Sequence, residues 1–104
     1  MQAADVLTTI AESLVATKKY KNLDEALYAL AIAEADRKIT KYRRRVNHLK
    51  KKYDMAFDEF TAHLRGRANI EQEDDWLEWE AALDMLSDWE ATKKELLQSA
   101  FSLS

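Results

Sequence analysis

The sequence of 104 residues has no proline, no cysteine and a single glycine. Tight turns and β-hairpins depend on proline and glycine, so their near absence favours an all-helical fold. Without cysteine the chain can form neither disulfides nor zinc–thiolate sites, and it has no thiol nucleophile. These absences predict an all-α protein that is suited to a reducing compartment.

Long apolar runs are also missing. No stretch of 18 apolar residues occurs, and the opening residues 1–5 lack the charged and then apolar layout of an export signal. We therefore expect a cytoplasmic protein without membrane contact. With 47% hydrophobic residues, the chain has enough apolar surface to form the core of one domain.

A regular apolar seam is the clearest pattern that is present. Its members recur at spacings of 3, 4, 3, 4, 3 and 4 residues: Ile32, Ala35, Ile39, Tyr42, Val46, Leu49 and Tyr53. This repeat is typical of a long helix that lies along another helix. A helix of about 30 residues is roughly 45 Å long, which predicts an elongated, coiled-coil-like molecule with one long central helix.

Helical periodicity and capping residues divide the chain into four predicted helices within a single domain. They cover residues 1–20, 23–52, 56–65 and 72–98. Asn22, followed by Glu25, has the pattern of a capping box that starts the long helix. Gly66 suits the left-handed position that ends the short helix. After residue 98 we expect the last helix to fray.

Basic and acidic residues occupy separate blocks. Nine Lys or Arg and no acid lie from Arg37 to Lys52, and nine Asp or Glu and no base lie from Glu71 to Glu90. An antiparallel hairpin of the two helices brings these blocks together and suits both helix dipoles. The hairpin can form within one chain, or by exchange of helices between the two chains of the homodimer that we expect.

Three tryptophans lie within fourteen residues of the last predicted helix. Tryptophan is common both in cores and at the centres of protein interfaces, so both interpretations stay open. The candidates for contact with a protein partner are Trp76, Trp79, Leu83, Leu86 and Trp89. Because the three indoles cannot all point one way, at least one should border a second surface.

The basic block is a second candidate site, because clustered cations on a helix neutralise phosphates. The candidates for contact with nucleic acid are Arg37, Lys41, Arg43, Arg44 and Arg45. The alternative interpretation is a solvated helix face that also meets the acidic helix. The negative net charge of the chain, −3, favours this alternative.

Patterns of catalytic and metal sites are lacking. Glu59 and His63 are four residues apart, whereas di-iron bundles need a spacing of three, and the acids of residues 71–78 do not follow the calcium-loop pattern. No Ser, His and Asp grouping and no glycine-rich phosphate loop can be assembled. We therefore expect no enzyme activity, no metal and no cofactor.

Three stretches carry a family resemblance. Residues 14–27 read LVATKKYKNLDEAL, residues 52–60 read KYDMAFDEF, and residues 74–82 read DDWLEWEAA. The first resembles the helix, basic turn and second helix of small prokaryotic antitoxins. The other two are similar to short helical archaeal and cyanobacterial proteins that are often paired with a small toxin.

The resemblance implies a protein that wraps and neutralises a toxin, commonly a ribonuclease. Ribbon-helix-helix antitoxins read operator DNA with an N-terminal strand, and residues 1–9 lack the alternating pattern of such a strand. The sequence thus predicts a non-catalytic helical interaction module, antitoxin-like in function. A nucleic-acid-binding helical protein that uses residues 37–52 and a purely structural helical oligomer are the alternatives.

Overall fold

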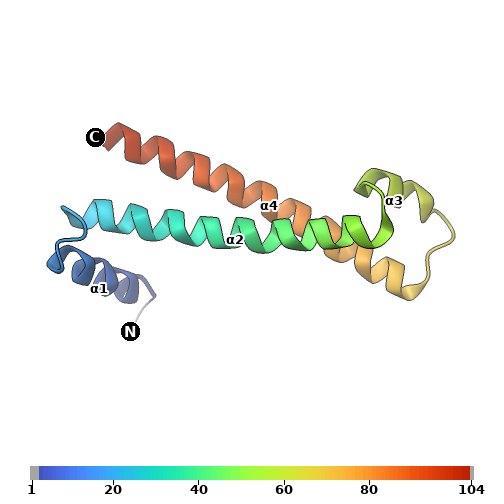
Figure 1. The fold of residues 1–104 in the computed structure, drawn as a ribbon, viewed down its shortest axis with the longest axis horizontal. Coiled ribbons are helices and arrows are strands. Elements are labelled where there is room, and N and C mark those ends of the chain that lie inside the picture. Colours follow the sequence, from blue (N-terminus) through green and yellow to red (C-terminus); the bar gives the residue numbers. More distant parts are fainter. Residues whose placement is uncertain (1–2, 104) are drawn as a thin grey trace. The chain divides into compact units, whose positions relative to one another are not determined.

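The computed structural model describes residues 3–103, with the side chains of residues 4–99. Over this range it contains four α-helices and no strand: α1 (Ala3–Ala16), α2 (Leu23–Tyr53), α3 (Phe57–His63) and α4 (Ile70–Leu103) (Figure 1). The prediction of an all-α fold is confirmed. Met1, Gln2 and Ser104, which belong to the terminal segments predicted above, lie outside the described residues.

The chain is divided into two compact units. Unit 1 comprises the residues up to Asp36 and from Ala91 onward, which means α1, the first part of α2 and the last part of α4. Unit 2 runs from Arg37 to Glu90 and contains the rest of α2, all of α3 and the first part of α4. Each long helix contributes residues to both units.

Unit 1 has a thin core. The buried residues among those described in this unit are Ala11, Ala26 and Ala35. Each alanine contributes a single methyl group, so the helices can approach closely but bury little apolar area. An ion pair of 2.6 Å between Lys93 Nζ and Asp36 Oδ1 joins α4 to α2 within this unit.

Unit 2 has a larger core, to which α2, α3 and α4 each contribute one large buried side chain. Leu49, Phe60 and Trp79 are at most 2% exposed. The partly buried residues that pack against them are Val46, Tyr53, Met55, Phe57, Leu64, Trp76 and Leu83. The Phe60 ring centroid lies 4.1 Å from that of Tyr53 and 5.4 Å from that of Trp79. Aromatic packing thus ties the short helix α3 to both long helices.

The first helix ends earlier than residue 20, the predicted boundary. Lys18 has a left-handed backbone with φ of 63°, which terminates α1 after Ala16. The N–H of Lys18 donates to the Val15 carbonyl at 2.9 Å, and the N–H of Lys19 donates to the Leu14 carbonyl at 3.1 Å. These two bonds form a Schellman motif, in which the left-handed position usually holds glycine.

The second helix begins where the sequence predicts. Asn22 Oδ1 accepts a hydrogen bond of 2.8 Å from the backbone N–H of Glu25, which caps α2 at its first residue, Leu23. The helix ends at Tyr53, and Asp54 follows with a left-handed φ of 51°. This change of backbone direction allows α3 to fold back toward the hairpin.

The third helix is shorter than the predicted range of 56–65, because its C-cap residue is Leu64. The N–H of Arg67 donates to the Leu64 carbonyl at 3.0 Å, and this closes a turn. Gly66 is the third residue of the turn and has φ of 68°. Glycine therefore adopts the predicted left-handed conformation, but in the turn beyond the helix end.

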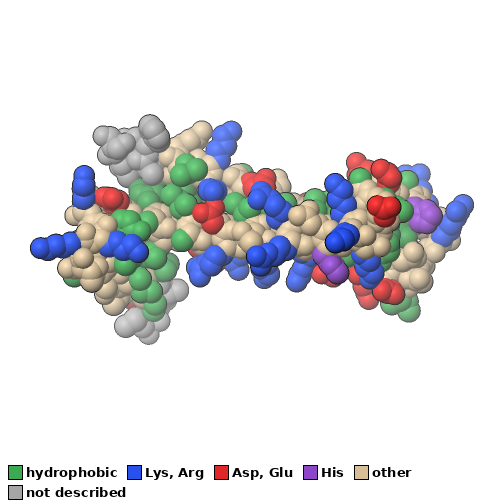
Figure 2. All heavy atoms as spheres, in the orientation of Figure 1, with side chains coloured by type: hydrophobic (Ala, Val, Ile, Leu, Met, Phe, Trp, Pro, Cys, Tyr) green, Lys and Arg blue, Asp and Glu red, His purple; other side chains and the backbone are tan. Residues whose placement is uncertain are grey.

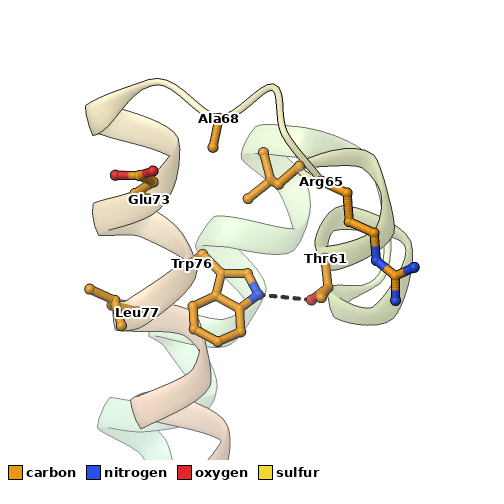
Figure 3. Close-up of a pocket in the computed structure, with 7 residues that line it drawn as sticks. Thr61, Arg65, Ala68, Glu73, Trp76 and Leu77 are labelled. Atoms are coloured by element: carbon orange, nitrogen blue, oxygen red, sulfur yellow. Dashed lines mark hydrogen bonds between the residues drawn. The ribbon is translucent and has the colours of Figure 1, made fainter.

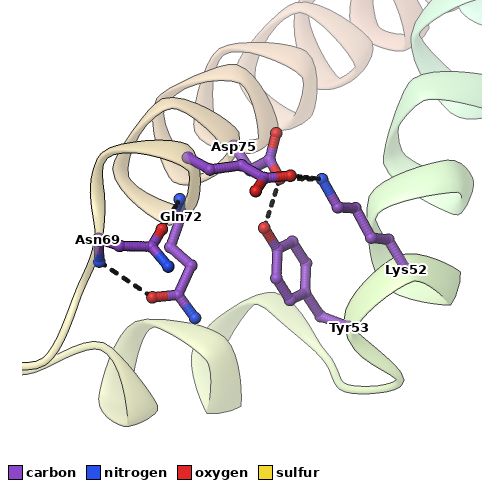
Figure 4. Close-up of polar contacts among 6 residues, drawn as sticks. Lys52, Tyr53, Asn69, Gln72 and Asp75 are labelled. Carbon is purple, nitrogen blue, oxygen red and sulfur yellow. Dashed lines mark hydrogen bonds and ion pairs between the residues drawn. The ribbon is translucent and has the colours of Figure 1, made fainter.

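The fourth helix begins at Ile70 rather than at residue 72 because Asn69 caps it. Asn69 Oδ1 accepts from the Gln72 backbone N–H at 2.8 Å, and Gln72 Oε1 accepts from the Asn69 N–H at 3.0 Å (Figure 4). This reciprocal pair is a capping box. The helix continues to Leu103, so the described part of the segment expected to fray is helical.

Candidate interaction surfaces

The predicted apolar seam of α2 lies on the inner side of both units. Ala35 in unit 1 is buried, as are Ile39 and Leu49 in unit 2. The remaining seam residues are half-buried: Ile32, Tyr42, Val46 and Tyr53. No seam residue is exposed. The seam therefore packs inside each unit and offers no free apolar strip along α2.

The basic and acidic blocks meet in unit 2 within one chain. Arg43 Nη2 lies 2.9 Å from Glu90 Oε1, and Arg45 Nε lies 3.2 Å from Glu78 Oε1. Further along α2, Lys52 Nζ lies 2.9 Å from Glu71 Oε1. Residues later in α2 pair with residues earlier in α4. The two helices are therefore antiparallel in unit 2, as the charge blocks predict.

The carboxylate of Asp75 joins this ladder to the aromatic core. Its Oδ2 lies 2.7 Å from Lys52 Nζ and also accepts a hydrogen bond from the Tyr53 phenol (Figure 4). The hydrogen bonds from Lys52 and Tyr53 lower the pKa of Asp75 below its ordinary value. Partial burial, followed by the hydrogen bond to Asp75, raises the pKa of Tyr53 to about 12.

The same contacts hold Lys52 in its charged form, because its hydrogen bonds to Asp75 and Glu71 raise the pKa of its ammonium group. The network therefore holds α2 against α4 through charge-assisted hydrogen bonds.

The predicted partner-binding residues of α4 lie largely in or against the core of unit 2. Trp79 is 1% exposed and Trp76 and Leu83 pack against it, while Leu86 and Trp89 are half-buried. Of the three indoles, Trp76 also lines a surface hollow, where its Nε1 donates to Thr61 Oγ1 at 2.8 Å (Figure 3). Trp76 therefore also borders the surface at this hollow.

The hollow beside Trp76 has a volume of about 410 Å³ and an apolar floor. It is lined by residues of α3, the connector and α4: Thr61, Leu64, Arg65, Ala68, Glu73, Trp76 and Leu77. Figure 3 shows Arg65 and Glu73 on opposite sides of it. The hollow is open and combines an apolar floor with one charge of each sign.

An exposed apolar face on α1 is the feature that the sequence interpretation missed. Val6, Leu7 and Ile10 are 42%, 51% and 44% exposed, although α1 also supplies the buried Ala11. In the space-filling view, hydrophobic side chains gather over α1 (Figure 2). Leu7, Ile10 and Leu14 follow the i, i+3, i+7 spacing of a helix that inserts into a groove. We call Val6, Leu7 and Ile10 the α1 apolar face.

The nucleic-acid candidates of α2 differ in their surroundings. Arg43 and Arg45 are engaged with acids of α4, as described above. Arg37, Lys41 and Arg44 are exposed, and Lys41 Nζ lies 5.2 Å from the centroid of the Tyr42 ring. Arg44 makes no ion pair with any residue that the structure describes. The ion pairs with the acids of α4 therefore involve only part of the basic block.

Two features are absent from the described part of the chain: a helix that could span a membrane and a side-chain group that could hold a metal ion. No helix among the described residues is both long and apolar enough to cross a membrane. No group of three or more His, Asp or Glu side chains in residues 4–99 is arranged to hold a metal ion. Comparisons with protein-family models, with curated proteins and with solved structures find no match.

Proposed function

We propose that the protein is a non-catalytic helical interaction module that binds another protein through the α1 apolar face. The observation that carries the proposal is the contrast within unit 1. The buried residues described there are three alanines, while Val6, Leu7 and Ile10 are about half exposed. Fully burying each such side chain from an exposed state contributes about 1.5–3 kcal/mol. Covering the face with a partner protein therefore contributes favourable free energy to binding.

The form of the face supports a helix-in-groove contact. α1 has only two charged residues, Asp5 and Glu12, and its apolar residues continue from the buried side to the exposed side. A partner with an apolar groove can receive Leu7 and Ile10, which lie on adjacent turns. The resemblance to antitoxins favours a small toxin protein as this partner, and neutralisation of the toxin as the function.

The proposal is tested by co-expression with the product of the adjacent reading frame, followed by size-exclusion chromatography with light scattering. We expect a complex with the wild-type chain and none with the Leu7→Ser/Ile10→Ser variant. The matched control is Ile70→Ser/Leu77→Ser, which removes two apolar side chains that are 78% and 60% exposed in unit 2. This control should keep the complex.

Three results would contradict the proposal. The first is the absence of a complex with the wild-type chain. The second is equal loss of the complex in both variants. The third is a free wild-type dimer whose mass halves only in Leu7→Ser/Ile10→Ser, because a second copy of the chain would then cover the face. The homodimer expected from the sequence stays a prediction, which the mass of the free chain tests directly.

A further inference from the structure

The hollow beside Trp76 adjoins exposed apolar surface on α4. Leu77 lines the hollow and is 60% exposed, and Ile70 is 78% exposed. These are the two highest values among the large hydrophobic side chains that the structure describes. The two residues are seven positions apart, so they lie on the same side of the helix, about 10 Å apart along its axis. We call the hollow together with Ile70 the α3–α4 groove.

The floor of this groove is apolar, and the polar atoms of Trp76 and Thr61 already have partners. The Trp76 indole N–H donates to Thr61 Oγ1, and the Thr61 hydroxyl donates to the Phe57 carbonyl at 2.9 Å. The side chains of Leu64 and Ala68 complete the lining beside the indole. An occupant therefore gains free energy by placing apolar side chains there, as in a helix-in-groove contact.

One charge of each sign flanks the floor. Arg65, in the turn after α3, and Glu73, in the first turn of α4, lie on opposite sides of it (Figure 3). Both residues are exposed, and neither has an ion pair within the described part of the chain. A matching occupant brings an acidic side chain toward Arg65 and a basic one toward Glu73. Its apolar stripe then has a different charge along each edge.

The composition of the groove discriminates among occupants. A small ligand binds where most of its surface is buried, whereas this hollow is open and Leu77 at its edge stays exposed. The α1 helix of a second copy has acids but no Lys or Arg, so it brings no cation toward Glu73. We propose that the α3–α4 groove binds an amphipathic helix of a different protein, with bases along one edge of its apolar stripe and acids along the other. The groove belongs to unit 2, so this partner is additional to the one proposed for α1 of unit 1.

The test is fluorescence anisotropy with three labelled synthetic helical peptides of about 18 residues, which is long enough to hold a helix. All carry leucines at the i, i+3, i+7 spacing. The mixed peptide has lysines along one edge of the leucine stripe and glutamates along the other, while the second has lysines and the third glutamates along both edges. The wild-type chain should bind the mixed peptide about threefold to tenfold more tightly than either of the others.

Reversal of one charge should change this preference. Arg65→Glu leaves an acid on each side of the floor, so the lysine peptide should become the tightest ligand. The matched control is Arg67→Glu, in the same connector but not in the lining of the hollow, which should keep the preference for the mixed peptide. Circular dichroism checks that both variants remain helical.

The apolar part of the groove is tested separately. Leu77→Ser should weaken binding of the mixed peptide about tenfold, whereas Met85→Ser, at a side chain of unit 2 that is 37% exposed, should keep it within about twofold. The variant Leu7→Ser/Ile10→Ser should bind the mixed peptide like the wild type, which separates this proposal from the one for α1.

Four results would overturn the proposal. They are the absence of binding to all three peptides, equal affinity of the wild-type chain for the three, an unchanged preference in Arg65→Glu, and the same change of preference in Arg67→Glu. A free wild-type dimer whose mass halves only in Leu77→Ser would also overturn it, because a second copy of the chain would then occupy the groove.

Discussion

The phenol of Tyr53, the last residue of α2, donates a hydrogen bond to the carboxylate of Asp75 in the second turn of α4. The same carboxylate oxygen lies 2.7 Å from Lys52 Nζ. The basic end of α2 and the acidic start of α4 thus meet at a single atom. Each helix end carries the charge that its dipole favours, so local and tertiary electrostatics stabilise the same arrangement.

Replacing Asp75 tests the contribution of this contact. Asp75→Asn removes the negative charge and should lower the free energy of unfolding at pH 7 by about 1 kcal/mol or less, because the Lys52 side chain is 36% exposed and the ion pair is screened. Urea unfolding measures the change. The matched control is Asp74→Asn, which removes an exposed neighbouring carboxylate and should have little effect.

The effect of Asp75→Asn should depend on pH. Because the pKa of Asp75 is lower in the folded than in the unfolded chain, its stabilisation is fully present above about pH 4. That stabilisation is lost as the pH falls through the lowered pKa of the folded state. The stability difference between wild type and variant should therefore shrink in acid, and a constant difference down to about pH 2 would contradict this assignment.

Tyr53 should lose its phenol proton at a higher pH than an ordinary tyrosine. Its pKa is raised to about 12 in the folded chain, from about 10 in an unfolded one, so folding is favoured by the neutral phenol below about pH 10. This stabilisation disappears as the pH rises toward 12. The difference in tyrosinate absorbance between wild type and Tyr53→Phe should show a step near pH 12. A step near pH 10 in the folded protein would show that Tyr53 is not held as described.

Trp79 should be the most sensitive position of unit 2. Its side chain is 1% exposed between Phe57, Phe60 and Tyr53, with ring centroids 5.4, 5.4 and 6.5 Å away. Trp79→Ala should cost about 3–5 kcal/mol of unfolding free energy, since it leaves a cavity that rings cannot fill. Leu77→Ala, at a side chain that is 60% exposed, should change stability by less than about 0.5 kcal/mol. Equal effects would place Trp79 outside the core.

The fold was predictable because its signals are local and redundant. The absence of proline, the capping pattern at Asn22 and the 3–4 seam of residues 32–53 all specify helices, and the segregated charges specify an antiparallel pairing. The start of α4 was predictable too, since Asn69 and Gln72 have the spacing of a capping box. The predicted start at residue 72 was based on the acidic residues that follow, because carboxylates are also favoured near helix N-termini.

The candidate site was harder to predict from the sequence. Helical periodicity shows that a face is apolar, but it does not show what covers that face. Trp79 and Ile10 both lie on apolar faces of their helices, yet Trp79 is 1% exposed and Ile10 is 44% exposed. The difference arises from the tertiary arrangement, in which unit 2 has aromatic side chains to fill its core and unit 1 has buried alanines.

The end of α1 illustrates a further limit of the sequence, because a lysine occupies a position that usually holds glycine. Lys18 has φ of 63°, a conformation that costs a residue with a Cβ roughly 1 kcal/mol. Lys18→Gly should relieve this cost and raise the unfolding free energy of unit 1 by about 0.5–1 kcal/mol, after allowing for the greater freedom of glycine in the unfolded chain.

Thermal unfolding followed by circular dichroism measures the effect of Lys18→Gly. Two controls separate backbone strain from the loss of a charge. Lys18→Ala retains a Cβ and should leave stability near that of the wild type, while Lys19→Gly should give no gain, since Lys19 does not have a positive φ. A stabilisation by Lys18→Ala as large as that by Lys18→Gly would assign the effect to charge. Relief of strain at the left-handed position predicts a gain for glycine alone.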